Sequence, residues 1–341
     1  MEQNGKVTMQ MIADQLGVTK VSVSKAINNQ PGVGPELKRR ILEKARELGY
    51  GGTSRRTSTA PQRLEFVISK RFFLEDEKFY SIIYYTLTKL CAERGIRLSL
   101  SVVGTTDVAK LVLPPSLLLE RPDGLFLGGD LGLAYSEALV QTGIPAVSID
   151  YCHPQLPIDS VVNDNFFAAY CGTSYLIAQG HRQIGFVGDI EHSASVMDRY
   201  FGYRKAMCAV NLPTQDDWVI VNDDVAGGYI VSCELPDPLP TAFLCHCDMA
   251  AYYLLLRLQA AGIAVPSRVS LLSFDNTEVA RNCVPMLTTI DIDKQRMAQV
   301  AFDRMLNRLE HPDDLTSRIT LDTKLIVRDS VAPPLMPKEA V

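Results

Sequence analysis

The amino-acid sequence predicts a small all-α helix-turn-helix head joined to an α/β core of two lobes, with two parallel sheets and helices on both faces. Two short amphipathic helical patterns precede residue 30, and beyond residue 64 apolar strands alternate with amphipathic helices. About 270 residues of this alternation is long for one open sheet, so we expect two lobes with a cleft between them.

The head is predicted from residues 7–28, which read VTMQMIADQLGVTKVSVSKAIN. Thr8 can cap a first helix, Gly17 ends it, and Thr19 can cap a second helix after a short turn. The apolar residues at helical spacing are Met9, Ile12, Ala13 and Leu16 in the first helix, and Val23, Ala26 and Ile27 in the second. The two helices therefore share one small core.

The outer face of the second helix gives the first indication of function. The residues opposite its buried side are Val21, Ser24, Lys25 and Asn28. In a helix-turn-helix this face enters the DNA major groove, where a valine methyl can contact a thymine methyl and a lysine can reach guanine O6 and N7. The alternative is that Val21 is an isolated surface residue without a role, which is common.

A third helix and a linker follow the first two helices. The helix is expected from Pro35 to about Leu48, since proline suits a first helical position and Leu37, Ile41 and Ala45 follow at helical spacing. Residues 51–62 read GGTSRRTSTAPQ, which is the composition of a linker. Either this segment is flexible, or it orders on DNA with Arg55 and Arg56 against phosphates or in the minor groove.

Charge is distributed unevenly along the chain. Residues 1–63 hold 11 Lys and Arg against 5 Asp and Glu, a net charge of +6, whereas the remainder holds 23 against 34, a net of −11. A basic amino-terminal piece on an acidic body suits a protein of which only one end meets a polyanion.

The core pattern can be assigned element by element. Helices of ten or more residues fit between many of the strands, which is typical of parallel sheets covered on both faces. Strands are predicted at residues 64–69, 97–103, 124–127, 145–149, 184–187, 219–221, 241–244 and 269–274, and helices near 80–94, 133–142, 166–179, 198–209 and 248–261.

Five of these strands are followed by an aspartate, at the strand ends where open α/β sheets bind ligands. An aspartate before a helix is commonly its N-cap, and we expect this role for about three of the five. Any that remain suit a neutral polyhydroxyl ligand, whose paired hydroxyls can donate to a carboxylate. The five are Asp130, Asp150, Asp189, Asp248 and Asp275.

The sequence shows no secretory signal and no apolar run of roughly 18 residues, so we expect a cytoplasmic protein without a membrane association. Its eight cysteines are scattered and are interpreted as reduced thiols. Cys245, His246 and Cys247 raise the possibility of zinc, but no second ligand pair lies nearby. Buried small side chains are therefore favoured, and neither a metal nor a cofactor is predicted.

Enzyme signatures are missing from the sequence. It contains no G-x-x-x-x-G-K-[ST], no G-x-S-x-G elbow and no H-E-x-x-H. Paired aspartates in a cleft can act as acid and base on a sugar, but that requires a shifted pKa and a leaving group, and the sequence indicates neither. We therefore predict that the protein is not an enzyme.

The motifs resemble those of the lac repressor and galactose repressor family of bacterial transcription regulators. The segment GVTKVSVSKAIN is similar to the family signature G-V-S-x-x-T-V-S-R-x-L-N. The resemblance covers nearly the whole chain, and its motifs occur in family order. They continue through LKRRILEKARELGY, GIPAVSIDY, VVNDNFFAAYCGTSYLIAQGHRQIGFVGD, DRYFGYRKAM, AAGIAVPSRVSLLSFDN and PMLTTIDIDKQRMAQVAFDRML.

This resemblance implies a core similar to periplasmic sugar-binding proteins, with the chain crossing between the lobes three times. It suggests a DNA-binding domain at residues 1–50, a hinge at 51–63, a two-lobed effector-binding and dimerisation domain at 64–330, and a tail at 331–341. The first lobe would comprise about 64–160 plus 292–322, and the second about 163–290 plus 323–330.

The resemblance also implies roles for individual residues of the head. Lys20 and Val21 occupy the pair that selects the operator, and Lys25 stands where arginine is usual. Lysine keeps the charge but lacks the planar fork of arginine, so readout of that base should be less strict. The candidate DNA-binding residues are Thr8, Thr19, Lys20, Val21, Ser22, Ser24, Lys25, Asn28, Arg55 and Arg56.

In the cleft, Asp150, Arg199 and Asp275 match positions that contact effectors in the family, and Phe79 resembles the aromatic residue of its first strand–helix loop. Two further candidate positions depart from the family pattern. Cys247 stands where an asparagine is frequent, and Val225 stands where several members have an aromatic platform. These departures leave the identity of the effector open.

Together these features predict a ligand-responsive regulator that binds palindromic double-stranded operator DNA as a homodimer, because one reading helix covers only a half-site. We expect a repressor of carbohydrate-utilisation genes that is relieved by a sugar or sugar derivative. Two alternatives stay open: a cytosolic sugar-binding or sugar-processing α/β protein, and a regulator with a purine or other non-sugar effector. Whether the effector releases or recruits DNA is also open.

The hinge generates a test. Family members usually carry A-R-x-L after L-G-Y, with a leucine that wedges between operator base pairs, whereas this chain reads SRRTST and has no leucine between Tyr50 and Arg63. We therefore predict a smaller operator bend, or one achieved differently, because an apolar wedge is what offsets the cost of unstacking. Gel mobility on circularly permuted operator fragments measures the bend. A sharp kink at the operator centre would show that another residue substitutes for the leucine.

Overall fold

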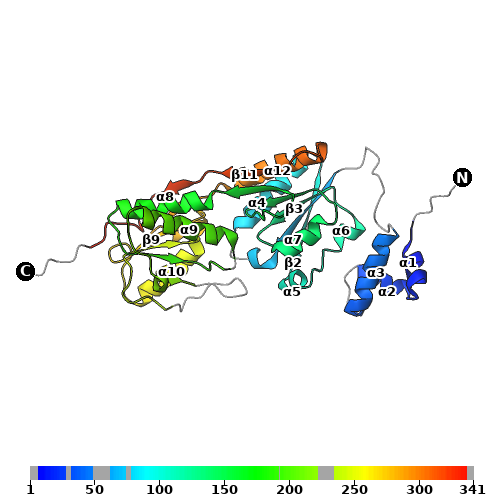
Figure 1. Ribbon diagram of the computed structural model, residues 1–341, viewed down its shortest axis with the longest axis horizontal. Coiled ribbons are helices and arrows are strands. Elements are labelled where there is room, and N and C mark those ends of the chain that lie inside the picture. Colours follow the sequence, from blue (N-terminus) through cyan, green and yellow to red (C-terminus); the bar gives the residue numbers. More distant parts are fainter. Residues whose placement is uncertain are drawn as a thin grey trace, which may run out of the picture.

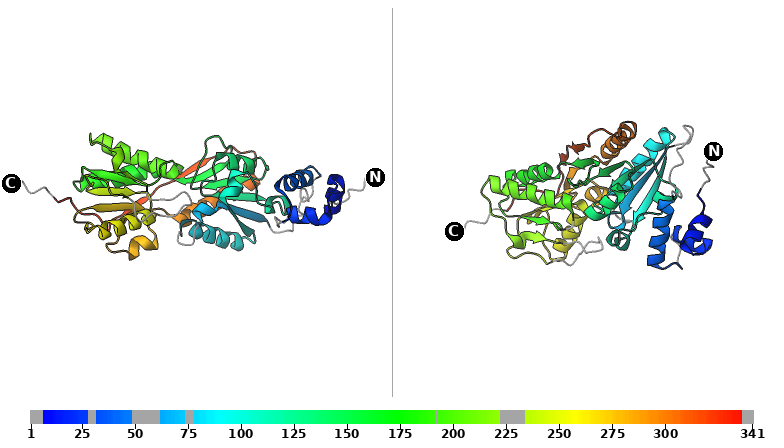
Figure 2. Two further views of the ribbon diagram at one scale, coloured as in Figure 1. Left: turned by 90° about the horizontal axis from the view of Figure 1, so that it is seen from below. Right: turned by 45° about the vertical axis from the view of Figure 1, so that its right-hand side comes forward.

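The computed structural model describes residues 7–27, 32–48, 62–73, 78–191, 193–221 and 234–335. Figure 1 shows three bodies in a row: a helical head at one end, a first lobe in the middle, and a second lobe at the other end. The turned views of Figure 2 keep the same order. The predicted all-α head and the two helix-covered sheets are confirmed.

The head consists of α1 (Met9–Leu16), α2 (Lys20–Ile27) and α3 (Pro35–Glu47). Its predicted boundaries are confirmed: Thr8 Oγ1 accepts from Met11 N at 3.3 Å, Gly17 ends α1 with a φ of 66°, and Thr19 Oγ1 accepts from Ser22 N at 3.0 Å. The three helices enclose one core, as expected. Its buried members are Ile12, Ala13, Val23, Ala26, Ile27, Ile41 and Ala45.

The first lobe is built on a six-stranded parallel sheet in the order β11-β5-β4-β3-β1-β2. Its strands are β1 (Arg63–Ser69), β2 (Arg97–Val103), β3 (Gly124–Gly128), β4 (Ala146–Ile149), β5 (Asp159–Asn163) and β11 (Arg318–Leu321). One face is covered by α4 (Phe79–Glu93) and α12 (Lys294–Glu310). The other face packs on α6 (Ser116–Leu119) and α7 (Leu133–Val140), and α5 (Thr105–Ala109) follows β2.

The second lobe has a six-stranded sheet in the order β12-β10-β9-β8-β6-β7. Its strands are β6 (Ile184–Val187), β7 (Val219–Ile220), β8 (Ala242–Cys245), β9 (Ser270–Phe274), β10 (Thr288–Asp291) and β12 (Lys324–Ile326). One face is covered by α8 (Asn165–Ala178) and α9 (Ala194–Ala209), the other by α10 (Asp248–Ala260) and α11 (Glu278–Asn282). Among the described strand pairs, only β10 and β12 run antiparallel.

The chain passes between the sheets three times: after β5, after β10, and between β11 and β12. Helix α12 follows β10 in sequence but packs on the first sheet, beside α4. All eight predicted strands are present, whereas β5, β10, β11 and β12 were not predicted as strands. Strand β5 carries polar residues that are nevertheless buried, namely Asp159, Ser160 and Asn163, so it lacks an apolar run.

Helices α8 and α9 pack closely because Gly202 faces α8. A Cβ atom added there would lie 2.1 Å from the Phe166 carbonyl oxygen and 2.9 Å from the Ala169 Cβ atom. We expect Gly202→Ala to lower the free energy of unfolding by about 3 kcal/mol, because the helix backbones must move apart. Urea unfolding measures the change. Gly104→Ala is the control, since a Cβ atom there meets only Asp107 Oδ2, at 3.5 Å. Equal stability of the two variants would contradict this packing.

Candidate functional site

A cavity of about 100 Å³ opens where the carboxyl ends of the two sheets face each other. Open α/β sheets bind ligands at such strand ends. The cavity brings together five of the six residues predicted to contact a ligand: Phe79, Asp150, Arg199, Cys247 and Asp275. The sixth, Val225, lies outside the described residues.

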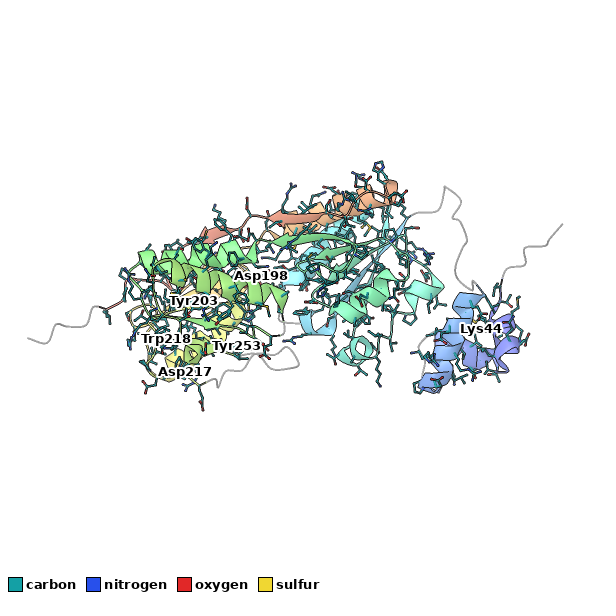
Figure 3. The ribbon with its side chains drawn as sticks, viewed as in Figure 1. Lys44, Asp198, Tyr203, Asp217, Trp218 and Tyr253 are labelled. Carbon is teal, nitrogen blue, oxygen red and sulfur yellow. The ribbon has the colours of Figure 1, made fainter. Side chains whose placement is uncertain are left out.

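Arg199 is the central cation of this cavity and is only 4% exposed. It stands on α9, and its neighbour Asp198 is labelled in Figure 3 on the side of the second lobe that faces the first. Its Nε donates to Asn165 Oδ1 at 2.9 Å, and its Nη1 donates to the His246 carbonyl oxygen. Its Nη2 lies 3.9 Å from Asp275 Oδ1, and its guanidinium lies 4.3 Å from the centre of the Phe274 ring.

Asp150 contributes a half-buried carboxylate from the first lobe. Its Oδ2 accepts from the Tyr80 hydroxyl at 3.1 Å, and its Oδ1 accepts from Asn163 Nδ2 at 3.2 Å. Burial raises the pKa of Asp150 to about 6 against the attraction of Arg199, and the nearby carboxylate of Asp275 adds to the rise. Asp150, Asp275 and Arg199 thus converge in a cavity whose charged lining also includes Asp130, Asp189 and Arg71.

Asp275 is held by the buried ammonium group of Lys294, whose Nζ donates to the Asp275 carbonyl oxygen at 2.5 Å. The same Nζ lies 5.5 Å from the centre of the Phe79 ring. Burial raises the pKa of the Asp275 carboxyl, while Arg199 and Lys294 oppose that rise. Lys294 therefore links α12 to both the acidic and the aromatic wall of the cavity.

His246 and Cys247 form the wall after β8. Burial and the charge of Arg199 lower the pKa of His246 to about 3, so its imidazole is neutral at pH 7. The sulfur of Cys247 accepts from Ala250 N at 3.3 Å and so caps α10. Among the described residues, no group of three or more His, Cys, Asp or Glu side chains is placed to hold a metal ion.

The expectation that about three of the five strand-end aspartates cap helices is wrong. Asp130 and Asp189 accept from the backbone N–H two residues later, Gly132 N and Glu191 N, and so stabilise turns. Asp248 lies inside the first turn of α10. The other two, Asp150 and Asp275, have φ angles of 69° and 98°, outside the extended conformation usual for a cap.

The head presents its candidate reading residues on and beside α2. Lys20 is exposed and Val21 is 62% exposed, which confirms an apolar side chain on the outer face. Ser22, Ser24 and Lys25 are half-buried, while Thr8 and Thr19 are exposed and occupied as helix caps. Three further candidates, Asn28, Arg55 and Arg56, lie outside the described residues.

The residues that shape the cavity and were not predicted from the sequence include Arg71, Phe72, Tyr80, Asn163, His246 as a wall residue, and Lys294. Asn163 ends β5 and was missed with that strand. Tyr80 stands next to the predicted Phe79, and its ring packs edge-on against Phe79 with centroids 5.0 Å apart. No local sequence feature identifies Lys294 as a residue near the cavity, because its chain segment reaches the cavity only through the second crossing between the lobes.

None of the described helices is long and apolar enough to cross a membrane. Residues 173–331 match the family described as periplasmic binding protein-like domain. The transcriptional repressor PurR of Vibrio campbellii is 26% identical over 332 residues, covering 95% of this chain and 98% of that protein. The ribose operon repressor of Haemophilus influenzae is 24% identical, with the same coverage of both chains.

Solved structures share the architecture. A complex of the transcriptional regulator CelR with cellobiose superposes with a TM-score of 0.69 at 24% identity, covering 95% of this chain and 99% of that one. The lac repressor dimer bound to operator and the anti-inducer ONPF gives a TM-score of 0.66 at 22% identity, covering 96% and 100%. At these identities, the two similarities establish a shared fold.

The raised pKa of the half-buried Asp150 carboxyl predicts a pH dependence of stability. The pKa of Asp150 is about 6 in the folded chain, against 3.8 for an ordinary aspartate. The folded state therefore holds the proton more tightly, so the contribution of Asp150 to the free energy of unfolding is present at low pH and is lost as the pH rises from about 4 through 6. Relative to Asp150→Asn, the wild-type chain should lose on the order of 2–3 kcal/mol of unfolding free energy over this interval.

Urea unfolding at a series of pH values measures that difference. Asp293→Asn is the matched control, because Asp293 is an exposed N-cap of α12 and asparagine caps a helix equally well. A difference between wild type and Asp150→Asn that stays flat from pH 4 to 7 would contradict the assigned burial.

Proposed function

We propose that this chain is a member of the lac repressor family of bacterial transcription regulators, a repressor whose DNA-reading head responds to a small molecule in the cleft, because its sequence relatives include the repressor PurR and the ribose operon repressor. The observation that carries this proposal is one chain that joins a head with an exposed reading face to a two-lobed core with a polar interlobe cavity. We assign the protein no catalytic role and place it in the cytoplasm, where its DNA target lies.

Operator binding rests on the shape and charge of the head. Lys20 and Val21 project from the first turn of α2, the part of a reading helix that meets base edges. Thr8 and Thr19 already satisfy backbone amides, so their hydroxyls would add phosphate contacts at most. A single head reads one half-site, and we therefore propose a homodimer on a palindromic operator.

The chemistry of the cleft supports a sugar or sugar derivative as effector. Asp150 and Asp275 offer carboxylate oxygens to vicinal hydroxyls, and Arg199 offers N–H groups to a ring or hydroxyl oxygen. Aromatic rings of Phe72 and Phe79 supply the apolar surface that the C–H face of a sugar ring needs. The similar regulator solved with cellobiose supports the same class.

A purine effector is the second candidate, because the sequence relatives include PurR repressors that are 26% and 27% identical to this chain. Phe72 and Phe79 can stack on a base as well as on a sugar ring. The carboxylates of the cavity favour the sugar, since the hydroxyls of a neutral polyol can donate to carboxylate oxygens. A ligand panel separates the two classes directly.

Communication between cleft and head follows from the arrangement of the bodies. In Figure 3, Lys44 marks the head and Trp218 the far end of the second lobe, with the first lobe between them. We propose that a ligand bound by both lobes favours a closed arrangement, and that the accompanying shift of the first lobe changes the spacing of the two heads.

Arg199→Ala tests this proposal. We expect sugars that raise the melting temperature of the full-length wild-type chain to lose that effect in the variant, because the cation that faces their oxygens is gone. Operator affinity without ligand should stay within about twofold, since the head has its own core. Thermal shift across monosaccharides, disaccharides, their phosphates and purines, together with gel-shift titration of operator DNA, measures both.

Arg204→Ala is the control for this test, since it lies on the same helix and contacts Tyr200 outside the cavity. Unchanged ligand response in Arg199→Ala would place the effector elsewhere. Stabilisation by purines alone would replace the sugar by the second candidate.

A further inference from the structure

A cavity of about 340 Å³ lies beside α8 at the passages between the lobes, and it is called the hinge cavity below. It shares no lining residue with the cavity around Arg199. Its lining includes Asp164 directly after β5, Ile290 near the end of β10, and the pair Asp322 and Thr323, which forms the whole connection between β11 and β12. The hinge cavity therefore borders all three passages, and its volume lies within the range of roughly 300–1,000 Å³ that is usual for small-molecule pockets.

Two aspartates of the hinge cavity follow neighbouring strands at the same level. Strands β5 and β11 are parallel, their last register pair is Asn163 opposite Leu321, and the Asp164 N–H donates to the Leu321 carbonyl oxygen at 3.1 Å. Asp164 and Asp322 are the next residues of the two strands, which lie about 4.8 Å apart in a sheet. Like charges opposite each other on neighbouring strands are destabilising. A cation bound between these two carboxylates would relieve that repulsion.

Neither carboxylate is neutralised by an ion pair with a described residue. Asp164 Oδ1 accepts from the Phe167 N–H at 2.9 Å and so caps α8. The Asp322 side chain is exposed and forms no hydrogen bond within the described part of the chain. Asp198 is a third acidic group nearby: burial raises its pKa and the Asp164 carboxylate adds to the rise, while Arg318 opposes it. The negative charge at the hinge cavity therefore suits a cationic ligand.

The remaining walls of the hinge cavity are apolar or small. They are formed by Phe167, Ala168, Cys171, Gly172, Ile290 and Leu325. The large side chain of Phe167 is 56% exposed, and its ring stacks on that of Tyr170 with centroids 6.1 Å apart. Lys205 Nζ lies 5.6 Å from the centre of the Tyr170 ring and 5.1 Å from that of Phe166, so rings of α8 already bind one ammonium group. These walls favour a cation that also carries an apolar body.

We propose that the hinge cavity is a second, regulatory ligand site, which binds a small organic amine with an apolar body. The ammonium group lies between Asp164 and Asp322, and the apolar body packs on Phe167 and Leu325. A metal ion suits the cavity less well, because among the described residues no group of three or more His, Cys, Asp or Glu side chains is placed to hold one.

The position of the hinge cavity gives the bound amine its regulatory effect. The segments that it touches connect the two lobes, so their backbone must adjust whenever the arrangement of the lobes changes. An amine that binds one arrangement more tightly shifts the chain towards it. Amine binding itself is independent of the proposed function, and only its regulatory effect rests on operator binding.

Calorimetric titration of the full-length chain tests the binding site. The probes are 2-phenylethylamine and pentylamine, their neutral counterparts 2-phenylethanol and 1-pentanol, and Mg²⁺ as a cation without an apolar body. We expect at least one amine to bind about tenfold or more tightly than its alcohol, because only the amine forms charge-assisted hydrogen bonds to the carboxylates. Added NaCl should weaken the amine, since the site is open to solvent.

Asp322→Asn should weaken amine binding by about tenfold, because it removes one of the two charges that hold the ammonium group. The exposed Asp322 has no described hydrogen bond, so the variant should keep the thermal stability of the wild type. Asp329→Asn is the matched control, since Asp329 is an exposed aspartate after β12 that does not line the hinge cavity. Phe167→Ala tests the apolar wall and should also weaken both amines.

Gel-shift titration measures the regulatory effect, with operator DNA that the full-length chain has selected from a random-sequence pool. A saturating amine should change operator affinity by about fivefold in the wild type, a typical coupling between two sites. The change should be absent in Asp322→Asn at the same amine concentration and present in Asp329→Asn.

Several outcomes would overturn the proposal. Equal binding of amines and alcohols, or equal amine affinity of the wild type and Asp322→Asn, would remove the site. Loss of amine binding in Asp150→Asn instead would place the amine in the cavity around Arg199, and tighter binding of Mg²⁺ than of either amine would make the ligand a metal ion.

The regulatory effect is decided separately from amine binding. An amine that binds through Asp322 but leaves operator affinity unchanged would contradict the regulatory role. Amine binding by a chain that selects no operator DNA would contradict the proposed function, and with it the regulatory role, while the amine site itself would stand.

Discussion

The arrangement of the second lobe around the cavity depends on the hydrogen bonds and the opposite charge that surround one buried cation, Arg199. A guanidinium removed from water costs several kcal/mol unless its donors and its charge are met within the protein. Arg199 meets these demands through the side chain of Asn165 at the start of α8, the carbonyl of His246 after β8, and the carboxylate of Asp275 after β9. The loops that end two neighbouring strands are therefore tied to two helices at the point where the ligand cavity begins.

Both lobes contribute residues to the ligand site. Arg199 is held within the second lobe by Asn165 and the His246 carbonyl, and Asp275 accepts at its carbonyl from Lys294 of α12, which packs on the first sheet. Asp150 and Phe79 come from the first lobe. Asp150 is in turn oriented by Tyr80 and Asn163 of the first lobe. Asp150 and Arg199 are thus each oriented within their own lobe, whereas Lys294 links Asp275 to α12 of the first lobe, and the complete site exists only when the lobes face each other.

Much of this architecture was predictable because most elements have a clear period. The eight apolar strands and the capped helices of the head follow directly from residue spacing, and the resemblance located Asp150, Arg199 and Asp275. Strand β5 was not predicted, because the buried Asp159 is compensated by Arg308 and by Ser317 N, partners about 150 residues away in sequence. A local sequence pattern cannot show that a buried carboxylate is paired with groups so far away in the sequence. Likewise, the left-handed backbone of Asp275 replaces the N-cap geometry that its position after a strand suggested, and Asp150 is followed by strand β5 rather than by a helix.

The shortest passage between the sheets limits how the two lobes can move. Only Asp322 and Thr323 separate β11 in the first sheet from β12 in the second. Three peptide steps span at most about 11 Å, so the sheet edges joined there stay close in any arrangement of the lobes. The lobes cannot slide apart, and opening must be a rotation with its axis near this edge. The displacement then grows with distance from that axis, so a small angular change there becomes a larger linear one at remote parts of the first lobe.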